Sequence, residues 1–368
     1  MDNTVGQESS TIPKEDILLV GFGAVGVIYA YALQSNRNVR VSVVARSNYQ
    51  TVQDRGVDIH STKFGHISGW RPDRVFPSVD AAAKSGPYSF VVVCTKCLPD
   101  VLPTSTLLAP FFEPPYVETH SQPVYALLQN GVGIERDFYN HAIMKLGNRN
   151  ISIISGALYI AANLRGDIVE HSEWGGSIKD GIIAGTYRPF WDENPSDWTP
   201  EPTESKTLGH FAQLFEPASV NVTIVDDIQP VKFQKNIINA AISSLSAITM
   251  VHPSLAFRDD AQEAHLRAHF SALLEELRLI ASSVFGIGLF PPENMVKLLD
   301  TIVALYKSSE TQHFPSIMLD RELGKPMEVE VILGECVRLA RRKNVSCPRL
   351  ETTYAILSVI QYRAISKS

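Results

Sequence analysis

The stretch Asp16–Arg46, DILLVGFGAVGVIYAYALQSNRNVRVSVVAR, decides the fold. Its apolar run ILLV is typical of a strand buried on both faces of a parallel sheet. Small and apolar residues then recur with helical spacing in VGVIYAYALQ, and VRVSVVAR has the composition of a second strand. A strand, a turn, a helix and a second strand in this order predict a nucleotide-binding α/β unit.

The turn of this unit carries the pattern G-x-G-x-x-G. The first glycine permits a tight turn, the second lets backbone N–H groups approach a pyrophosphate, and the third lets helix and strand pack closely. Three glycines also occur in plain tight turns, but here they follow a strand and open a helix. We therefore predict a cofactor-binding segment made of Gly21, Gly23, Ala24, Val25 and Gly26.

Polar residues end three of the predicted strands. Arg46 stands where an NAD site has an acidic residue for the ribose, and an arginine there can pair with a 2′-phosphate. It therefore favours NADPH/NADP+ as the cofactor, although a solvated arginine gives the same pattern. Lys96 and Asn130 follow the apolar runs FVVV and VYALL. Because ligands of doubly wound sheets bind beyond the carboxyl ends of the strands, both are candidate cofactor contacts.

Cys94 and Cys97 form a C-x-x-C pair, a pattern of redox dithiols and zinc sites. The other two cysteines, Cys336 and Cys347, lack matching spacing, so no four-ligand zinc site can be assembled. Cys94 also falls inside a predicted apolar strand, where a free cysteine packs as a small hydrophobe. We therefore predict neither a metal site nor a redox pair.

The 368 residues are enough for two domains. The predicted class is α/β, with an N-terminal Rossmann-type doubly wound sheet followed by an all-helical C-terminal domain. We expect a disordered polar arm over 1–15, an NADP-binding domain over 16–227 and a helical substrate and catalytic domain over 228–368. The helices of the last domain are expected over 230–250, 260–285, 292–308, 327–343 and 350–366.

The segment between these patterns is less regular. Alternating residues over 151–185 predict strands at an antiparallel edge of the first domain. The proline-rich segment 186–206 predicts a surface loop, followed by a helix over 208–219 and a short strand over 220–227.

Composition limits the partners. A net charge of −6 with 20% charged residues gives no reason to expect nucleic acid or an anionic membrane. No run of about 18 apolar residues exists, so no membrane-spanning helix is expected. Four cysteines do not form a disulfide framework, and we expect a cytoplasmic protein with a small-molecule partner. The apolar faces of the helical domain leave a homodimer open.

The segment KFQKNIINAAISSL places Lys235, Asn239 and Ser243 four residues apart, on one face of a helix. This stripe suits a cleft that holds a carboxylate, a carbonyl and hydroxyls, although a solvated face has the same pattern. Further on, Ser316 precedes a Gly-Lys-Pro turn and Glu328 opens an apolar helix. Acidic residues in a first helical turn are often only partners of the helix dipole.

Five segments together resemble one family: GFGAVG, VVVCTKC, LLQNGVG, KFQKNIINAAIS and PSIMLDRELGKPMEVEVI. Their order and approximate spacing are similar to those of 2-dehydropantoate 2-reductases, also called ketopantoate reductases, over nearly the whole chain. The N-terminal arm and the long middle loop resemble the fungal branch. The resemblance implies NADPH-dependent reduction of 2-dehydropantoate (a keto acid) to (R)-pantoate, in pantothenate and coenzyme A biosynthesis.

The resemblance also implies roles for single residues. Lys235 is the expected general acid, Glu328 an active-site carboxylate, and Asn239 and Ser316 substrate contacts. Family members often carry a second asparagine where this chain has Ser243, which leaves the substrate open. A reductase of another 2-keto or β-keto acid, in secondary metabolism for example, is therefore the alternative.

Two other classes of function stay open. A regulatory protein could sense NADP(H) without chemistry, but damaged catalytic positions would then be expected, and they are intact here. A non-redox enzyme that reuses the cleft is the other class.

Overall fold

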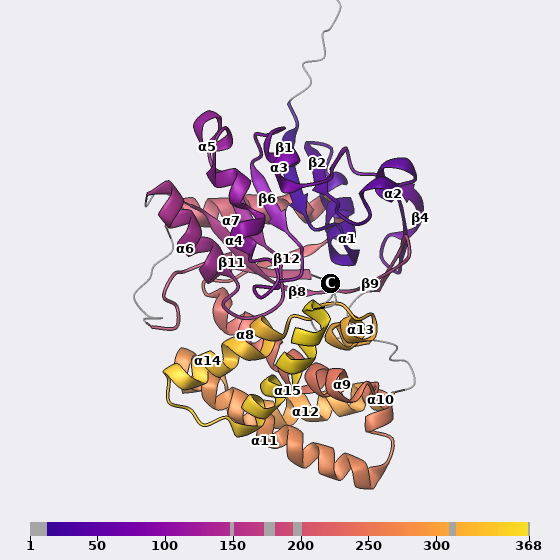
Figure 1. Cartoon of the computed structure of the whole chain (residues 1–368), viewed down its shortest axis with the longest axis vertical. Helices are drawn as coiled ribbons and strands as arrows, with labels where there is room; N and C mark the ends of the chain where they lie inside the picture. Colours follow the sequence, from indigo (N-terminus) through magenta and orange to yellow (C-terminus); the bar gives the residue numbers. More distant parts are fainter. Residues whose placement is uncertain (1–12, 148–150, 173–180, 194–200, 309–313, 367–368) are drawn as a thin grey trace, which may run out of the picture.

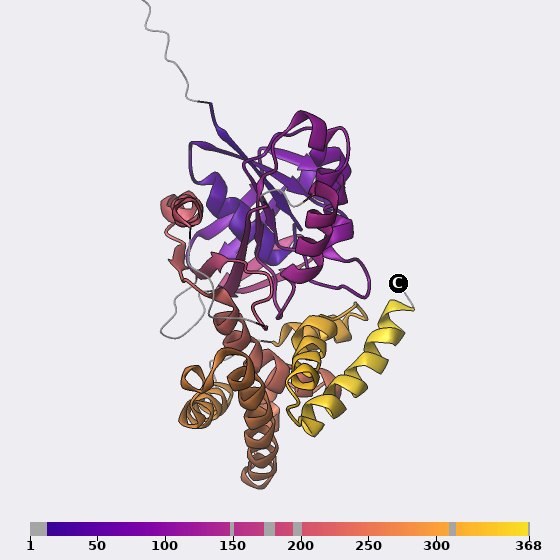
Figure 2. The same cartoon turned by 90° about the vertical axis from the view of Figure 1, so that its left-hand side faces the viewer.

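The computed structural model describes residues 13–147, 151–172, 181–193, 201–308 and 314–366. Figures 1 and 2 show the strands gathered in one part of the molecule and the later helices in the other, with α8 (Ile228–Ile238) leading from one to the other. This arrangement confirms the predicted α/β class and the helical C-terminal region.

The main sheet has eight strands in the order β12-β11-β8-β7-β6-β1-β2-β5. All neighbours are parallel except β8 and β11, which are antiparallel. Since β1 lies between β2 and β6, the winding reverses there, at the point where such sheets bind ligands. The strands are β1 Glu15–Val20, β2 Val39–Val44, β5 Arg74–Phe76, β6 Phe90–Val93, β7 Val124–Leu127, β8 Ile153–Tyr159, β11 Gly181–Thr186 and β12 Asn221–Ile224.

A second sheet has the order β4-β3-β10-β9, with β3 at Val57–Ser61, β4 at Gly65–Trp70, β9 at Ala161–Arg165 and β10 at Ile168–Ser172. The predicted antiparallel edge is therefore confirmed for β8 and β11 and wrong for β9 and β10. The physical reason is burial: β10 alternates buried and exposed residues and packs one face towards α1, whereas the main strands are buried on both faces.

Seven α-helices accompany the described sheet residues: α1 Ala24–Gln34, α2 Tyr49–Asp54, α3 Val79–Ala83, α4 Thr104–Leu107, α5 Tyr116–Thr119, α6 Glu135–Leu146 and α7 Pro202–Phe215. Short 3-10 turns are η1 Ala109–Phe112 and η2 Glu216–Ala218.

Two predictions about this part of the chain need correction. Glu15, assigned to the arm, begins β1; residues 1–12 lie outside the described residues. The predicted loop 186–206 runs into α7, and its Trp191 and Asp192 are buried.

After α8 the chain is helical, as predicted. The elements are the π-helical turn η3 Asn239–Ser243, α9 Ser244–Thr249, α10 Pro253–Ala256, α11 Asp260–Phe285, the 3-10 turn η4 Ile287–Leu289, α12 Pro292–Lys307, α13 Ser316–Glu322, the π-helical turn η5 Glu330–Gly334, α14 Glu335–Arg342 and α15 Pro348–Ile365. The prediction missed α13, because a Gly-Lys-Pro turn signal follows it directly and masks its short helical pattern.

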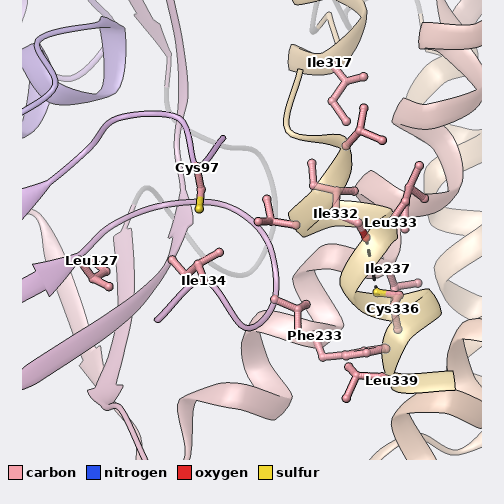
Figure 3. Close-up of a cluster of buried hydrophobic side chains, with 14 of the residues drawn as sticks. Cys97, Leu127, Ile134, Phe233, Ile237, Ile317, Ile332, Leu333, Cys336 and Leu339 are labelled. Carbon is pink, nitrogen blue, oxygen red and sulfur yellow. Dashed lines mark hydrogen bonds between the residues drawn. The ribbon is translucent and has the colours of Figure 1, made fainter. Parts of the chain in front are cut away.

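One apolar cluster joins the two parts of the molecule. Figure 3 shows Leu127, Ile134 and Cys97 from the sheet side and Ile237 and Ile332 from the helical side of this cluster. All five side chains are buried. Since burying one such side chain contributes roughly 1.5–3 kcal/mol, the cluster holds the sheet and the helices in contact.

The glycine segment after β1 is shaped by close packing at two of its glycines. A Cβ atom on Gly26 would lie 1.9 Å from the carbonyl oxygen of Gly21, which explains why only glycine fits there. Gly21 itself has a φ of +102°, and a Cβ on it would lie 2.5 Å from the backbone nitrogen of Thr95. No atom lies within 4 Å of the position of a Cβ on Gly23.

Replacing Gly26 with alanine should therefore lower the free energy of unfolding by roughly 1–3 kcal/mol, because a methyl group would overlap a backbone carbonyl. Gly23→Ala is the matched control: it adds the same methyl group in open space and should leave stability close to wild type. Urea unfolding followed by circular dichroism measures both. An equal loss in the two variants would contradict this packing.

Candidate active site

The carboxyl ends of three adjacent parallel strands form the floor of the site. Gly21 follows β1, Lys96 follows β6 by a short loop and Asn130 follows β7, and β6 pairs in parallel with both neighbours. Helix α1 starts directly after Gly23, and no side chain caps its N-terminus. Its first N–H groups are therefore available to an anionic ligand.

The residues around α1 fit a dinucleotide. The open space at Gly23 lets a ligand approach the backbone closely, in contrast to the filled space at Gly21 and Gly26. The Asn48 side chain donates a hydrogen bond of 2.8 Å to the carbonyl of Phe22, which ties the loop after β2 to the glycine segment. Arg46 is exposed on this same loop, so its guanidinium is free to take an additional phosphate.

Across the floor, a chain of hydrogen bonds connects the helical part to the sheet. The Lys235 ammonium on α8 donates to Asn130 Oδ1 at 2.7 Å, and Asn130 Nδ2 donates to Glu328 Oε2 at 3.3 Å. The backbone N–H of Cys97 donates to Glu328 Oε1 at 3.0 Å. Glu328 is 2% exposed, so this carboxylate is buried but paired on both oxygens. The structure thus brings together Lys235, Asn130 and Glu328.

The Asn130 loop is fixed by backbone contact as well. Val132 N–H donates to the carbonyl of Val331 on η5 at 2.9 Å. Gly131 has a φ of +96°, and a Cβ there would lie 2.5 Å from the Val331 Cβ. Glycine at this position therefore permits the close approach that places Asn130 between Lys235 and Glu328.

Burial lowers the pKa of Lys235 to about 8. The Glu328 carboxylate opposes this effect and favours the charged ammonium, while a second ammonium, that of Lys232, lowers the pKa of Lys235 further. An ammonium with a pKa near neutrality is suited to donate a proton at physiological pH.

A second polar contact crosses between the two parts of the molecule. Lys96 forms an ion pair with Asp320 of α13, which is 4% exposed. Burial raises the pKa of Asp320 to about 6, and the Lys96 ammonium opposes that rise. Lys96 therefore contacts an acidic residue of the helical part in this structure, a partner that sequence spacing did not indicate.

A small open space lies at this site. Of the predicted residues, Asn130, Lys235 and Asn239 line it. Its full lining is Gln129, Asn130, Gly131, Gly156, Ala157, Lys232, Lys235, Asn236 and Asn239. Sequence reasoning missed Lys232, although its position three residues before Lys235 would have placed it on the same helical face.

The other two predicted substrate contacts lie elsewhere. Ser243 is buried and Ser316, the first residue of α13, is exposed; neither lines this space. The expected stripe of Lys235, Asn239 and Ser243 assumed a continuous α-helix. Residues 239–243 form a π-helical turn instead, and the buried Ser243 does not line this space.

The four cysteines are free thiols. Cys94 lies just past the end of β6 rather than inside it, and Cys97 is buried, which raises the pKa of its thiol to about 12. The described residues contain no group of three His, Cys, Asp or Glu placed to bind a metal ion. A search of the same residues finds no helix with the length and apolar character needed to cross a membrane.

Comparison with known proteins agrees with this geometry. The model of the family "Ketopantoate reductase PanE/ApbA" matches residues 17–185, and the model of its C-terminal domain matches residues 227–361. The chain belongs to the ketopantoate reductase family.

Individual relatives cover almost the whole chain. The uncharacterized protein YDL144C of Saccharomyces cerevisiae is 27% identical over 360 residues, which are 94% of this chain and 93% of that protein. The crystal structure of 2-dehydropantoate 2-reductase from Methylococcus capsulatus is 26% identical, with a TM-score of 0.70, over 95% of this chain and 97% of that one. A ternary structure of D-mandelate dehydrogenase with NADH and anilino(oxo)acetate shares the fold at 15% identity, with a TM-score of 0.71, over 95% and 99% of the two chains.

A ketopantoate reductase is an oxidoreductase that acts on a CH–OH group with a nicotinamide cofactor.

Proposed function

We propose that this protein reduces 2-dehydropantoate to (R)-pantoate with NADPH, and that Lys235 is the general acid. The observation that carries the proposal is the hydrogen bond from Lys235 to Asn130 in an open space at the carboxyl end of β7. We further propose that residues 16–227 bind the cofactor and that residues 228–368 supply Lys235 and Glu328.

Bound cofactor supplies a hydride to C2 of the keto acid. The segment Gly21–Gly26, with Ala24 and Val25 at the start of α1, would hold its pyrophosphate, and Arg46 its 2′-phosphate. Lys96 and Asn130, at the ends of β6 and β7, are the proposed contacts nearer the reacting end.

Lys235 has the donors that the chemistry requires. Its ammonium has three N–H groups, of which Asn130 receives one in this structure, so two remain for a substrate. One can donate to the keto oxygen, polarise the carbonyl, and transfer its proton as negative charge grows on that oxygen. A positioned general acid of this kind typically contributes about 10²–10⁴-fold to the rate.

Asn130 and Glu328 orient this acid. Asn130 Oδ1 accepts from Lys235 while its amide group is fixed by Glu328, so the side chain cannot flip without losing both bonds. Glu328 also favours the protonated form of Lys235 at neutral pH. Asn239 lines the open space and is the proposed substrate contact; Ser243 and Ser316, which do not line it, stay predictions.

Reduction of another 2-keto acid on the same scaffold is the second candidate. Ser243 favours it, because the family resemblance implies an asparagine at this position and a hydroxyl is shorter. D-mandelate dehydrogenase, which was solved with anilino(oxo)acetate, shows that this fold is not limited to one substrate. We place the reaction in the cytoplasm, in pantothenate biosynthesis for the first candidate, which fits four unpaired cysteines.

Lys235→Ala should reduce kcat for 2-dehydropantoate by about 10²–10⁴-fold, because the proton donor is lost. The Kd for NADPH should change little, since Lys235 lies on the helical side of the site. Gln234→Ala, on the exposed side of α8, is the control and should keep both values. Steady-state kinetics and fluorescence titration measure them, and an unchanged kcat in Lys235→Ala would overturn its role.

Arg46→Ala should raise the Kd for NADPH roughly 10- to 100-fold, as expected for the loss of charge-assisted hydrogen bonds, and leave NADH binding nearly unchanged. Arg37→Ala removes an exposed arginine near the opposite end of β2 and serves as the matched control. Equal weakening of both cofactors by Arg46→Ala would show that Arg46 does not contact the 2′-phosphate.

A further inference from the structure

A second lysine lies at the bottom of the same open space, in a setting unlike that of Lys235. The Lys232 ammonium donates to Glu135 Oε1 at 2.7 Å and to Ser155 Oγ at 2.9 Å. Ser155 also donates to Glu135. The side chains of Lys232 and Glu135 are 2% and 0% exposed, so this is an ion pair withdrawn from water.

The carboxyl group of this pair is held in its ionised form. Burial alone would raise the pKa of Glu135, but the Lys232 ammonium and the hydrogen bonds from Lys232 and Ser155 outweigh it and hold the pKa below its ordinary value. Glu135 therefore stays ionised at neutral pH. A buried pair of this kind gains little stability over an apolar pair of similar size, because both charges lose their hydration.

The location of Lys232 points to the reaction rather than to stability. It stands three residues before Lys235 on α8, so the two Cβ atoms lie about 5–6 Å apart on one face. Both side chains line the same space. Glu135, in contrast, comes from α6 and approaches Lys232 from the side of β8, where Ser155 lies.

We propose that Lys232 is a positioning residue for the proposed reduction: its fixed positive charge behind Lys235 makes Lys235 release its proton more readily to the keto oxygen. In that step the N–H bond of Lys235 breaks, the O–H bond of the product forms, and the cofactor supplies the hydride. Lys232 itself exchanges no proton. The inference rests on the proposed function, because it requires Lys235 to be the acid.

Few other charges act on Lys235. Glu328 faces it across the space and raises its pKa, whereas Lys232 lowers it. Strands β8 and β11, which pack against α8, carry no Lys, Arg, Asp or Glu in their described residues. On α11, Glu275 and Glu276 are paired with arginines, Arg278 and Arg349 respectively. Lys232 is thus the positive charge that can tune Lys235.

The test compares kcat/KM for keto-acid reduction across pH, because this quantity reports ionisation of the free enzyme. Reduction needs protonated Lys235, so activity of the wild type should fall as pH rises through about 8. The double variant Glu135→Gln/Lys232→Met removes both charges and leaves none unpaired. Its alkaline limb should move to higher pH by about one unit.

Two further variants separate charge from structure. Ser155→Ala loosens the same cluster but keeps its charges. Its kcat/KM should therefore fall at the same alkaline pH as that of the wild type. Lys232→Gln removes the ammonium but keeps a hydrogen-bond donor for Glu135. The fall of its kcat/KM should move to higher pH, as in the double variant. Melting temperature and NADPH affinity verify that each variant is folded.

A second measurement does not depend on turnover. Labelling Lys235 with acetic anhydride across pH, quantified by mass spectrometry, follows its ionisation directly. A higher midpoint in Lys232→Gln and in the double variant, but not in Ser155→Ala, supports the proposal. If the labelling midpoint of Lys235 does not shift in folded Lys232→Gln, the proposed role of Lys232 is wrong. The same holds if Ser155→Ala shifts the midpoint by an equal amount. If the midpoints shift as expected while Lys235→Ala retains full turnover, the proposed function fails instead.

Discussion

The site depends on keeping one half-buried ammonium charged next to a buried carboxylate. Burial favours the neutral form of Lys235, and the carboxylate of Glu328 opposes this through Asn130. Glu328 can itself be buried and ionised because the Cys97 N–H and Asn130 satisfy its two oxygens. The balance leaves a lysine that is charged at neutral pH and still a good proton donor.

The fold holds the parts of this balance together through contacts between the sheet and the helices. Asn130 comes from the end of β7, Lys235 from α8 and Glu328 from the start of the helix that contains η5. The hydrogen bond from Val132 to Val331 and the apolar cluster around Ile332 bring these elements into contact. The two π-helical turns, η3 and η5, occur where the chain borders the site, a common place for such turns.

Local patterns in the sequence predicted much of this arrangement. The glycine triplet, the apolar strands and the long helix α11 follow from short-range patterns. Asn130 follows from its place at the end of a strand, and Lys235 from its spacing on a helix face and from the family resemblance. Contacts between residues far apart in the sequence could not be predicted from such patterns. Lys96 pairs with Asp320 across a separation of 224 residues, and Lys232 pairs with Glu135 across a separation of 97 residues. No rule based on short-range spacing predicts either pair. The π-helical turn over Asn239–Ser243 was not predicted either, and the role of Ser243 stays a prediction.

Our central proposal is that this site reduces a 2-keto acid with NADPH. The most direct measurement is the loss of NADPH absorbance when the purified protein is mixed with 2-dehydropantoate and, separately, with a panel of other 2-keto acids. We expect turnover, with 2-dehydropantoate as the preferred substrate. If the protein binds NADPH tightly but oxidises it with none of these acids, the proposed reduction is wrong.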